Sequence, residues 1–240
     1  MILKIGLALV VAGLAATASL TVAPAMAQQA TAPSAAAADL PTYKPPLRGA
    51  PGGRVGGASR GATGGAPVSI ELVSPDSHTG LTTNPSPTLY YFVSRPVAEP
   101  MKLTISAAMQ PKPLIETAIP APRGAGIQSV RLADYRVQLQ PGISYAWSIS
   151  VVVDPQSPSR DVVATATIMR TDASAASASG GAQTPGRAGQ LAQAGLWYDA
   201  VAAAADSAAT DRHAAFDALL DQVGLRDAAA IDRQMAQNGR

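Results

Sequence analysis

The chain has 240 residues, of which 47% are hydrophobic, 4% aromatic and 14% charged, and its formal net charge is +2. The absence of cysteine excludes disulfides, thiolate metal sites, cysteine nucleophiles and lipid attachment to a lipoprotein cysteine. The small net charge argues against a nucleic-acid partner, because a nucleic-acid-binding protein concentrates Lys and Arg on one face or in one run. Composition therefore restricts the class of protein and leaves its activity open.

The first 27 residues predict a signal peptide. Lys4 precedes an apolar run over residues 5–20, and Ala25-Met26-Ala27 has the small-x-small pattern of a cleavage site. An uncleaved membrane anchor is the alternative, because the apolar stretch just reaches the length of a membrane span. We expect cleavage near Ala27 and an exported protein, either periplasmic or secreted.

Residues 28–67 predict a disordered arm rich in Gly, Pro and Arg. Between residues 41 and 67, five Pro and eight Gly occupy 13 of 27 positions, and such a chain buries too little surface to offset its ordering entropy. Arg48, Arg54 and Arg60 recur every six residues, and the arm has a local charge of +3. The arm is either a soluble spacer or a tether that docks on an acidic partner, an anionic lipid or an anionic glycan.

Residues 68–171 predict an antiparallel β-sandwich. The segment holds six of the ten aromatic residues, and its short runs of alternating apolar and polar residues are separated by Pro or Gly. Strands are expected at residues 69–73, 88–94, 102–107, 114–119, 128–132, 144–153 and 161–170. Seven strands in this length are typical of an immunoglobulin-like or fibronectin-III-like sandwich.

One motif, Leu139-Gln-Pro141-Gly142-Ile-Ser-Tyr145-Ala-Trp147, is the most informative in this segment. It is similar to the tyrosine corner of immunoglobulin-like sandwiches, in which the Tyr hydroxyl bonds a backbone group a few residues upstream. We expect Tyr145 to close this corner and Trp147 to fill the core between the sheets. Pro141 and Gly142 are interpreted as structural residues of the same motif.

Residues 172–184 predict a flexible linker, because ten of the thirteen are Ala, Ser or Gly. Residues 185–240 predict a helical region that begins near Pro185. Its first helix carries one apolar stripe at spacings of three and four, which consists of Leu191, Ala194, Gly195, Tyr198, Val201, Ala202 and Ala205.

A second helix is expected over residues 211–223, with Thr210 as its cap. Gly224 should take the left-handed conformation at its end, and Leu225 should fold back on the helix. A third short helix is expected over residues 227–237. Its inward residues should be Ala228, Ile231 and Met235.

The first two helices resemble one tetratricopeptide-like hairpin, although the chain has no repeat of that period. One hairpin buries little surface by itself. We therefore expect the helices to pack on the sandwich or on a partner, with Trp197 as the contact.

The two ends of the mature chain carry opposite charges. Residues 172–240 hold eight acidic residues and five arginines, a net charge of −3. The acidic surface is either an ordinary solvated face or the surface that receives the basic arm, in the same molecule or in a neighbouring one.

Catalytic and metal chemistry has little support in the sequence. A hydrolase would need His78, with Asp76 and with Ser74 or Ser77 as nucleophile, but nothing around these serines resembles a nucleophile elbow. The chain has no His-x-x-x-His pair and no calcium-loop motif. We therefore expect no catalytic residues, no cofactor and no metal.

Several motifs, taken in chain order, resemble the exported bacterial proteins grouped as domain of unknown function 928. The matching segments are residues 43–57, 80–82, 87–92, 139–142, 145–147, 154–155 and 159–161, Arg170, and residues 195–200 and 223–225. The resemblance implies a secreted or periplasmic protein with a sandwich followed by helices, and it implies no activity. It also implies that the Arg/Gly arm and the turn Trp197-Tyr198-Asp199 matter beyond spacing. The long Ala/Ser linker and residues 226–240 depart from the family pattern.

The sequence favours a non-catalytic interaction or scaffold module of the bacterial cell envelope, with another envelope or inner-membrane protein as partner. This expectation rests on the scarcity of catalytic side chains and on analogy with adhesive modules of the same fold. The candidate interaction residues are Arg48, Arg54, Arg60, Trp197, Tyr198 and Asp199.

Two alternatives remain open. The first is a glycan-binding or peptidoglycan-binding module that uses Tyr90, Phe92 or Trp197 with arginines as a platform. The second is an envelope hydrolase that uses Asp76 and His78. Aromatic side chains exposed on one face would favour the binding module, whereas inward alternation would favour the scaffold.

Overall fold

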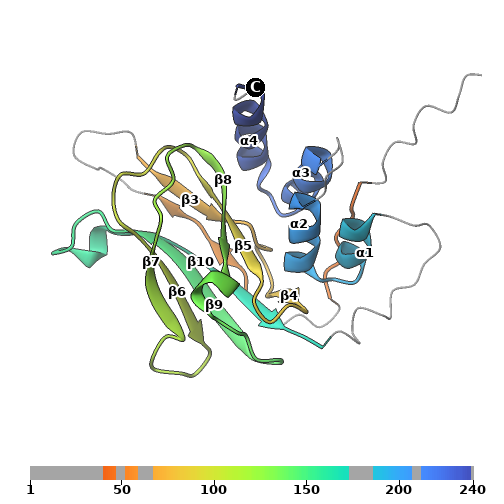
Figure 1. Ribbon diagram of the computed structural model, residues 1–240, viewed down its shortest axis with the longest axis horizontal. Coiled ribbons are helices and arrows are strands. Elements are labelled where there is room, and N and C mark those ends of the chain that lie inside the picture. The colour runs from red at the N-terminus through yellow and green to blue at the C-terminus, as the bar shows by residue number, and fades with distance from the viewer. Residues whose placement is uncertain (1–39, 47–51, 59–66, 173–185, 207–211, 239–240) are drawn as a thin grey trace, which may run out of the picture. The chain divides into compact units, whose positions relative to one another are not determined.

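The computed structural model describes residues 40–46, 52–58, 67–172, 186–206 and 212–238 (Figure 1). The predicted signal peptide and nearly all of the predicted linker lie outside these ranges. Within the described ranges, no helix is both long enough and apolar enough to cross a membrane.

The described chain is mainly antiparallel β-structure followed by four α-helices. The strands are β1 (Arg54–Val55), β2 (Gly57–Ala58), β3 (Ser69–Leu72), β4 (Gly80–Thr82), β5 (Thr88–Val93), β6 (Met101–Ala107), β7 (Ile115–Ile119), β8 (Gly126–Arg131), β9 (Ser144–Val151) and β10 (Val162–Arg170). Two short 3-10 helices are η1 (Leu132–Tyr135) and η2 (Pro158–Arg160). The seven strands predicted from alternation are all present, and their ends agree within two residues. The three short strands β1, β2 and β4 were not predicted.

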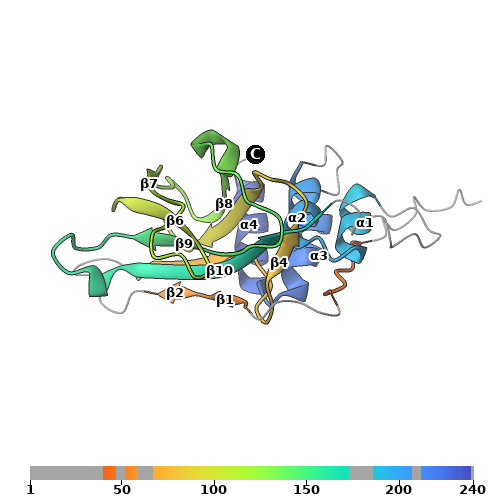
Figure 2. The same cartoon turned by 90° about the horizontal axis from the view of Figure 1, so that it is seen from below.

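The strands form two facing sheets. One has the order β1-β10-β9-β6-β7, with β4 also paired to β10, and the other has the order β2-β3-β5-β8. Strand β4 runs parallel to β10 and pairs with its last residues, while β1 pairs with its middle. Strands β1 and β2 lie next to each other along this side (Figure 2). The outer edges of β10 and β3 are therefore covered, whereas β7 and β8 end the two sheets on the other side.

The register places alternate side chains in the core between the sheets. Ile105, Trp147 and Ala166 lie opposite one another on β6, β9 and β10, and all three are buried. In the other sheet, Leu72 pairs with Tyr91, and both are also buried. A strand exposes every second residue to the same face, so this register confirms the predicted core position of Trp147.

The predicted corner before β9 is present. The backbone N–H of Gln140 donates to the Tyr145 hydroxyl at 3.1 Å. The adjoining turn is held to the end of β10, because Pro141 forms a bridge with Arg170 and the Gly142 N–H donates to the Arg170 carbonyl at 2.8 Å. The motif thus fixes where the chain enters its longest hairpin.

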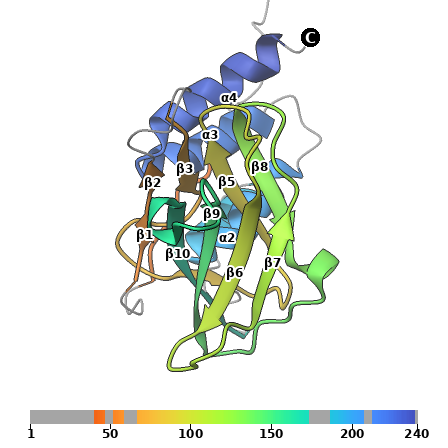
Figure 3. The ribbon, with the colours of Figure 1, turned by 90° about the vertical axis from the view of Figure 1, so that its left-hand side faces the viewer.

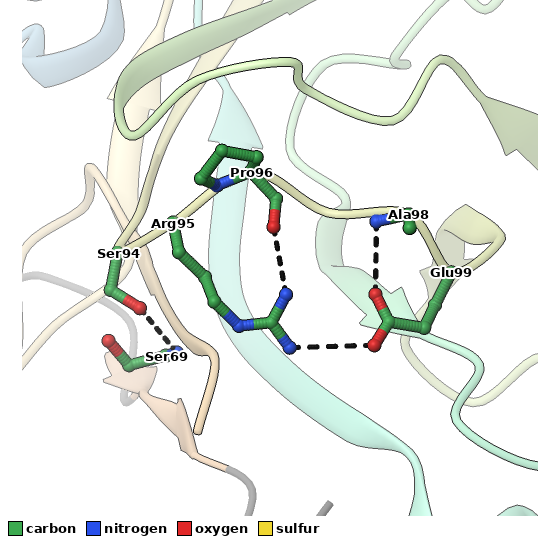
Figure 4. Close-up of polar contacts among 6 residues, drawn as sticks. All are labelled: Ser69, Ser94, Arg95, Pro96, Ala98 and Glu99. Carbon is green, nitrogen blue, oxygen red and sulfur yellow. Dashed lines mark hydrogen bonds and ion pairs between the residues drawn. The ribbon is translucent and has the colours of Figure 1, made fainter. Parts of the chain in front are cut away.

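A polar cluster holds the crossover from β5 in one sheet to β6 in the other (Figure 4). Arg95 and Glu99 form an ion pair at 3.4 Å, and Glu99 also accepts the Ala98 N–H at 3.0 Å. Ser94 Oγ accepts the Ser69 N–H at 2.9 Å, which joins the crossover to β3. Backbone hydrogen bonds lower the pKa of Glu99, so its carboxylate remains charged in this loop.

The helices are α1 (Arg187–Gln193), α2 (Trp197–Ala205), α3 (Arg212–Gln222) and α4 (Arg226–Asn238). The prediction of one continuous first helix is wrong, because the chain turns between α1 and α2. Gly195 has a φ of 76°, and a Cβ there would lie 3.1 Å from the Lys44 carbonyl oxygen. Residues 40–46 pack against this turn, where the Lys44 N–H donates to the Ala192 carbonyl at 3.0 Å.

The predicted stop after α3 is confirmed. Gly224 has a φ of 73°, and the Leu225 N–H donates to the Leu220 carbonyl at 3.0 Å. The inward position predicted for Met235 is wrong, because its side chain is 44% exposed. Helix α4 buries Ala228 and Ala229 near its beginning, and Met235 lies beyond the turn that contacts β8.

Helices α3 and α4 cover the outer face of the β3-β5-β8 sheet, on the side away from β6 and β9 (Figure 3). Tyr90 on the outer face of β5 makes an edge-on contact with Phe216 of α3, with ring centroids 5.8 Å apart. Asp232 of α4 accepts the Ile127 N–H of β8 at 3.0 Å. Helices α3 and α4 therefore form a third layer on one sheet.

Two stretches of the predicted disordered arm are ordered. Residues 40–46 pack beside the helices, where the Tyr43 N–H donates to Gln222 Oε1 at 2.7 Å. Residues 52–58 form β1 and β2, and a Cβ on Gly57 would lie 2.6 Å from the backbone of Val163. The prediction of disorder is wrong for both stretches. Residues 40–46 are held by hydrogen bonds to the helices, and Gly57, which has no side chain, lets residues 52–58 lie directly on β10. The rest of the predicted arm lies outside the described residues.

Candidate functional site

Trp197, Tyr198 and Asp199 form the first turn of α2 and make polar contacts with the sheets. We call these three residues and their partners the α2 contact cluster; the partners are Val73, Ser74, Thr82, Thr83, Trp147 and Thr167. Trp197 and Tyr198 are fully buried, and Asp199 is partly buried. The predicted interaction turn therefore joins two parts of the same chain.

Tyr198 lies at the centre of the α2 contact cluster. Its hydroxyl accepts the Trp147 Nε1–H at 2.9 Å. It also lies 3.1 Å from Ser74 Oγ and 3.1 Å from the Thr167 carbonyl oxygen. Burial raises the pKa of Tyr198 to about 12, so the hydroxyl stays protonated and can donate to the carbonyl.

Asp199 connects α2 to the end of β4. Its carboxylate accepts the Thr82 hydroxyl, the Thr83 N–H at 2.8 Å and the Thr83 hydroxyl at 2.7 Å. Because a carboxylate only accepts, three donors from one short segment satisfy it without a cation. Asp199 therefore holds the end of β4 to α2, and both of its carboxylate oxygens accept hydrogen bonds.

Trp197 connects α2 to the N-terminal stretch and to the loop after β3. Its Nε1–H donates to the Val73 carbonyl at 3.1 Å, and its ring packs edge-on against Tyr43. Tyr43 in turn stacks on His78, and its hydroxyl lies 2.8 Å from His78 Nε2. Burial raises the pKa of Tyr43 and lowers that of His78, while the charge of Asp76 partly opposes the shift at His78.

Arg54 is the one predicted arginine of the arm that the structure describes. Its guanidinium donates to the Val223 carbonyl at 2.6 Å, at the C-terminal end of α3, and lies 3.5 Å from the Leu72 carbonyl. Burial lowers its pKa, and the carboxylates of Glu71 and Asp76 partly offset that effect. A cation at this position satisfies a carbonyl at a helix end. Arg48 and Arg60 lie outside the described residues.

The side chains named for a hydrolase do not form a nucleophile-base-acid arrangement among themselves. Ser74 is buried against Tyr198, and Ser77 Oγ lies 3.4 Å from His78 Nδ1 on an exposed loop. The other ring nitrogen of His78 contacts Tyr43, where a triad would require a carboxylate. No group of three or more potential metal ligands occurs within the described ranges.

The aromatic platform named for a glycan-binding module is covered. Phe92 and Trp197 are buried, and Tyr90 packs against Phe216. All three side chains are therefore covered by other described parts of the chain.

An open groove lies at the side where the two sheets end. This β7–β8 groove has a volume of about 590 Å³ and is lined by Tyr91, residues 119–123 and 128–131, Asp134 and Tyr135. The loop after β7 forms one wall, while β8 and η1 form the other. A volume of a few hundred Å³ is typical of ligand-binding clefts.

The β7–β8 groove combines tyrosines with an excess of positive charge. Arg131 forms an ion pair with Asp134 at 3.1 Å, and both side chains are exposed. Arg123 is also exposed and forms no ion pair with another described residue. Tyr91 is only 2% exposed, and burial raises its pKa to about 12 with a contribution from Tyr135. The groove can therefore offer the protonated Tyr91 hydroxyl and guanidinium groups to a ligand.

The residues of this groove were not predicted as a site. Tyr91 follows the inward alternation of its strand, which indicates a core residue and nothing more. Arg123 precedes β8 and Arg131 is its last residue, and both meet Tyr91 only because β8 pairs with β5. Pro120 and Pro122, on either side of Ala121, indicate an irregular segment at the end of β7, but they do not indicate a ligand.

The described fold is that of a two-sheet β protein with a layer of helices on one sheet. The family described as Domain of Unknown Function (DUF928) matches residues 55–232, and the chain belongs to this family. The match confirms the resemblance seen in the motifs, and its range includes both the α2 contact cluster and the β7–β8 groove. No curated protein and no solved structure matches the chain.

Proposed function

We propose that this protein is a non-catalytic interaction or scaffold module of the bacterial cell envelope. In this proposal an immunoglobulin-like sandwich presents a binding surface, and the helices, with a tetratricopeptide-like hairpin, are fixed to it. The signal-peptide pattern before Gln28 supports export and a partner in the periplasm or inner membrane.

The strand order supports the immunoglobulin-like part of this proposal. When the seven longer strands are lettered A to G in chain order, A, B and E share one sheet, while C, F and G share the other. This division is typical of immunoglobulin-like sandwiches, and the corner formed by Tyr145 supports the same conclusion. The fourth strand, β7, lies at the edge of the second sheet.

The observation that carries the proposal is the contrast between the α2 contact cluster and the β7–β8 groove. Polar side chains that are able to perform chemistry, including Tyr198, Asp199 and His78, are engaged with other parts of the chain. The groove instead has Arg123, Arg131 and Tyr135 at an accessible surface. An accessible polar groove beside internally engaged polar side chains favours recognition over catalysis.

Purification of the full chain from the envelope fraction, at its natural abundance, tests this function. We expect a stoichiometric complex with another envelope protein, measured by light scattering and identified by mass spectrometry. The His78→Ala variant should form the same complex, because His78 lies outside the groove. An isolated chain whose hydrolytic activity disappears in His78→Ala would contradict the proposal and support the hydrolase.

A further inference from the structure

We propose that the β7–β8 groove binds an extended acidic peptide segment of the partner, and that this segment adds to β8 as an extra antiparallel or parallel strand. This inference rests on the function proposed above and specifies its binding site. It follows from the direction of the β8 backbone groups, from the groups that cover neighbouring edges and from the charge of the groove.

The outward direction of the β8 amides follows from two hydrogen bonds. The Tyr90 carbonyl accepts the Val73 N–H, so it points toward β3 and away from its β8 partner, Ser129. On the opposite edge, the Ile127 N–H donates to Asp232 of α4. Because N–H groups alternate between the two edges of a strand, the amides of Ser129 and Arg131 point to the same free edge as that of Ile127.

Asp232 shows how this edge can be used. Its carboxylate oxygen lies 3.0 Å from the Ile127 nitrogen, where the carbonyl of an added strand would otherwise accept. The contact covers the beginning of β8 and leaves the amides of Ser129 and Arg131, which are about 6.6 Å apart along an extended strand. A peptide in an extended conformation presents carbonyl groups at the same spacing, which a small ligand does not.

The opposite wall of the groove is less suited to strand addition. Pro120 and Pro122 follow β7 directly and have no N–H to donate. The Pro122 carbonyl already accepts the Val97 N–H at 3.0 Å. The added strand therefore pairs with β8, and the loop after β7 contacts its side chains.

The side chains of the groove favour an acidic peptide. Two arginines face a single carboxylate, Asp134, which already pairs with Arg131. Arg123 remains available to a carboxylate of the ligand. At the floor, the Tyr91 hydroxyl forms no hydrogen bond with another described residue, and it can donate to the peptide. This pattern matches β-strand addition, in which main-chain bonds give affinity and side-chain contacts give specificity.

The first test measures peptide binding to the full mature chain by fluorescence anisotropy. The probe is a labelled pool of peptides of about seven residues, in which Val, Ile, Thr or Phe alternates with Glu. A matched pool has Lys in place of Glu. We expect saturable binding of the Glu pool, weaker binding of the Lys pool and a loss of affinity as salt increases.

A matched pair of variants tests strand addition itself. Ser129→Pro removes the outward N–H while sparing the bonds to β5, and it should weaken binding of the Glu pool about tenfold. Ser129→Ala keeps the N–H and should bind like the parent. Thermal unfolding of both variants establishes that the sheet is intact.

A charge variant keeps the test decisive if Ser129→Pro does not fold. Arg123→Glu leaves the backbone unchanged and should reduce affinity for the Glu pool while increasing it for the Lys pool. In the parent, hydrogen exchange at the Ser129 and Arg131 amides should slow when peptide binds. Unchanged exchange at both amides would contradict strand addition.

Equal binding of the Glu pool by the parent and by a folded Ser129→Pro variant would overturn this inference. So would binding of a linear polyuronate oligosaccharide in the absence of any peptide binding, because the groove would then be a glycan site. If the envelope complex forms but survives folded Ser129→Pro and Arg123→Glu unchanged, the proposed function stands and the groove inference fails. If the parent forms no complex and binds no peptide, both fail.

Discussion

The indole nitrogen of Trp147 donates a hydrogen bond to the hydroxyl of Tyr198 at 2.9 Å, although the two residues lie 51 positions apart. Trp147 occupies the core between the sheets, and Tyr198 belongs to the first turn of α2. The two rings also make an edge-on contact, with centroids 6.4 Å apart. The sheets and the helices therefore share one buried hydrogen-bonded cluster, and we expect them to unfold as one cooperative unit.

Removal of the Tyr198 hydroxyl should destabilise the whole described fold. Tyr198→Phe leaves the buried Trp147 N–H without its acceptor, and an unsatisfied buried donor costs about 1–3 kcal/mol. Urea unfolding followed by fluorescence and by circular dichroism should give one shifted transition. Tyr90→Phe is the matched control, because Tyr90 contacts Phe216 through its ring; its stability should change by less than about 0.5 kcal/mol. Equal stability of Tyr198→Phe and the parent would contradict the role of the cluster.

The Asp199 carboxylate should matter through its contacts with Thr82 and Thr83. Asp199→Asn replaces one acceptor oxygen by an NH2 group that faces donors, so the free energy of unfolding should fall by about 2 kcal/mol. Asp227→Asn is the control, because Asp227 is an exposed acid in the first turn of α4. A similar loss in both variants would attribute the effect to the helix dipole.

The regular parts of this fold could be predicted because they follow simple periodicity. Seven strands alternate with period two, and Gly224 with Leu225 ends α3 as the pattern indicated. The short strands β1, β2 and β4 carry too few residues for any period, and they form only because β10 and β3 offer free edges. The glycines that indicated a flexible arm are the residues that permit this close approach.

His78 should make stability depend on pH. Burial lowers its pKa in the folded protein below the ordinary 6.5, so the unfolded chain takes up the proton first as pH falls. Above about pH 6.5, where His78 is neutral in both states, it does not lower the free energy of unfolding. As pH falls from there toward the folded pKa, the free energy of unfolding decreases. The urea midpoint of His78→Gln should therefore fall less between about pH 7 and pH 5 than that of the parent.

Asp76 provides the second half of this pH test. Its charge raises the pKa of His78, so Asp76→Asn should lower that pKa further and steepen the loss of stability at low pH. Identical slopes in the parent, His78→Gln and Asp76→Asn would show that His78 does not contribute.

A side chain at Gly57 should weaken the attachment of the N-terminal stretch. Gly57→Ala places a methyl group 2.6 Å from the backbone of Val163, and relief of such overlap typically costs about 1–3 kcal/mol. Hydrogen exchange should increase at β1 and β2 before it increases elsewhere. Gly124→Ala meets no atom within 4 Å and should be neutral, which makes it the matched control.

The candidate groove was harder to predict than the fold, for a physical reason. The family resemblance pointed to Trp197, Tyr198 and Asp199, and the structure uses these side chains in contacts within the chain. Arg123 and Arg131 are ordinary surface residues in the sequence. They form a site only after tertiary pairing leaves β8 with an open edge, and no local pattern encodes that edge.

Site-specific photocrosslinking in the cell envelope tests whether the β7–β8 groove binds the partner. In one variant a photoreactive amino acid replaces Arg131 in the β7–β8 groove. In a second variant it replaces Val163, an exposed residue of β10. We expect the Arg131 position to crosslink to an acidic extended segment of one envelope protein, mapped by mass spectrometry, and the Val163 position not to crosslink to it. Crosslinking of that partner from Val163 and not from Arg131 would contradict binding in the β7–β8 groove.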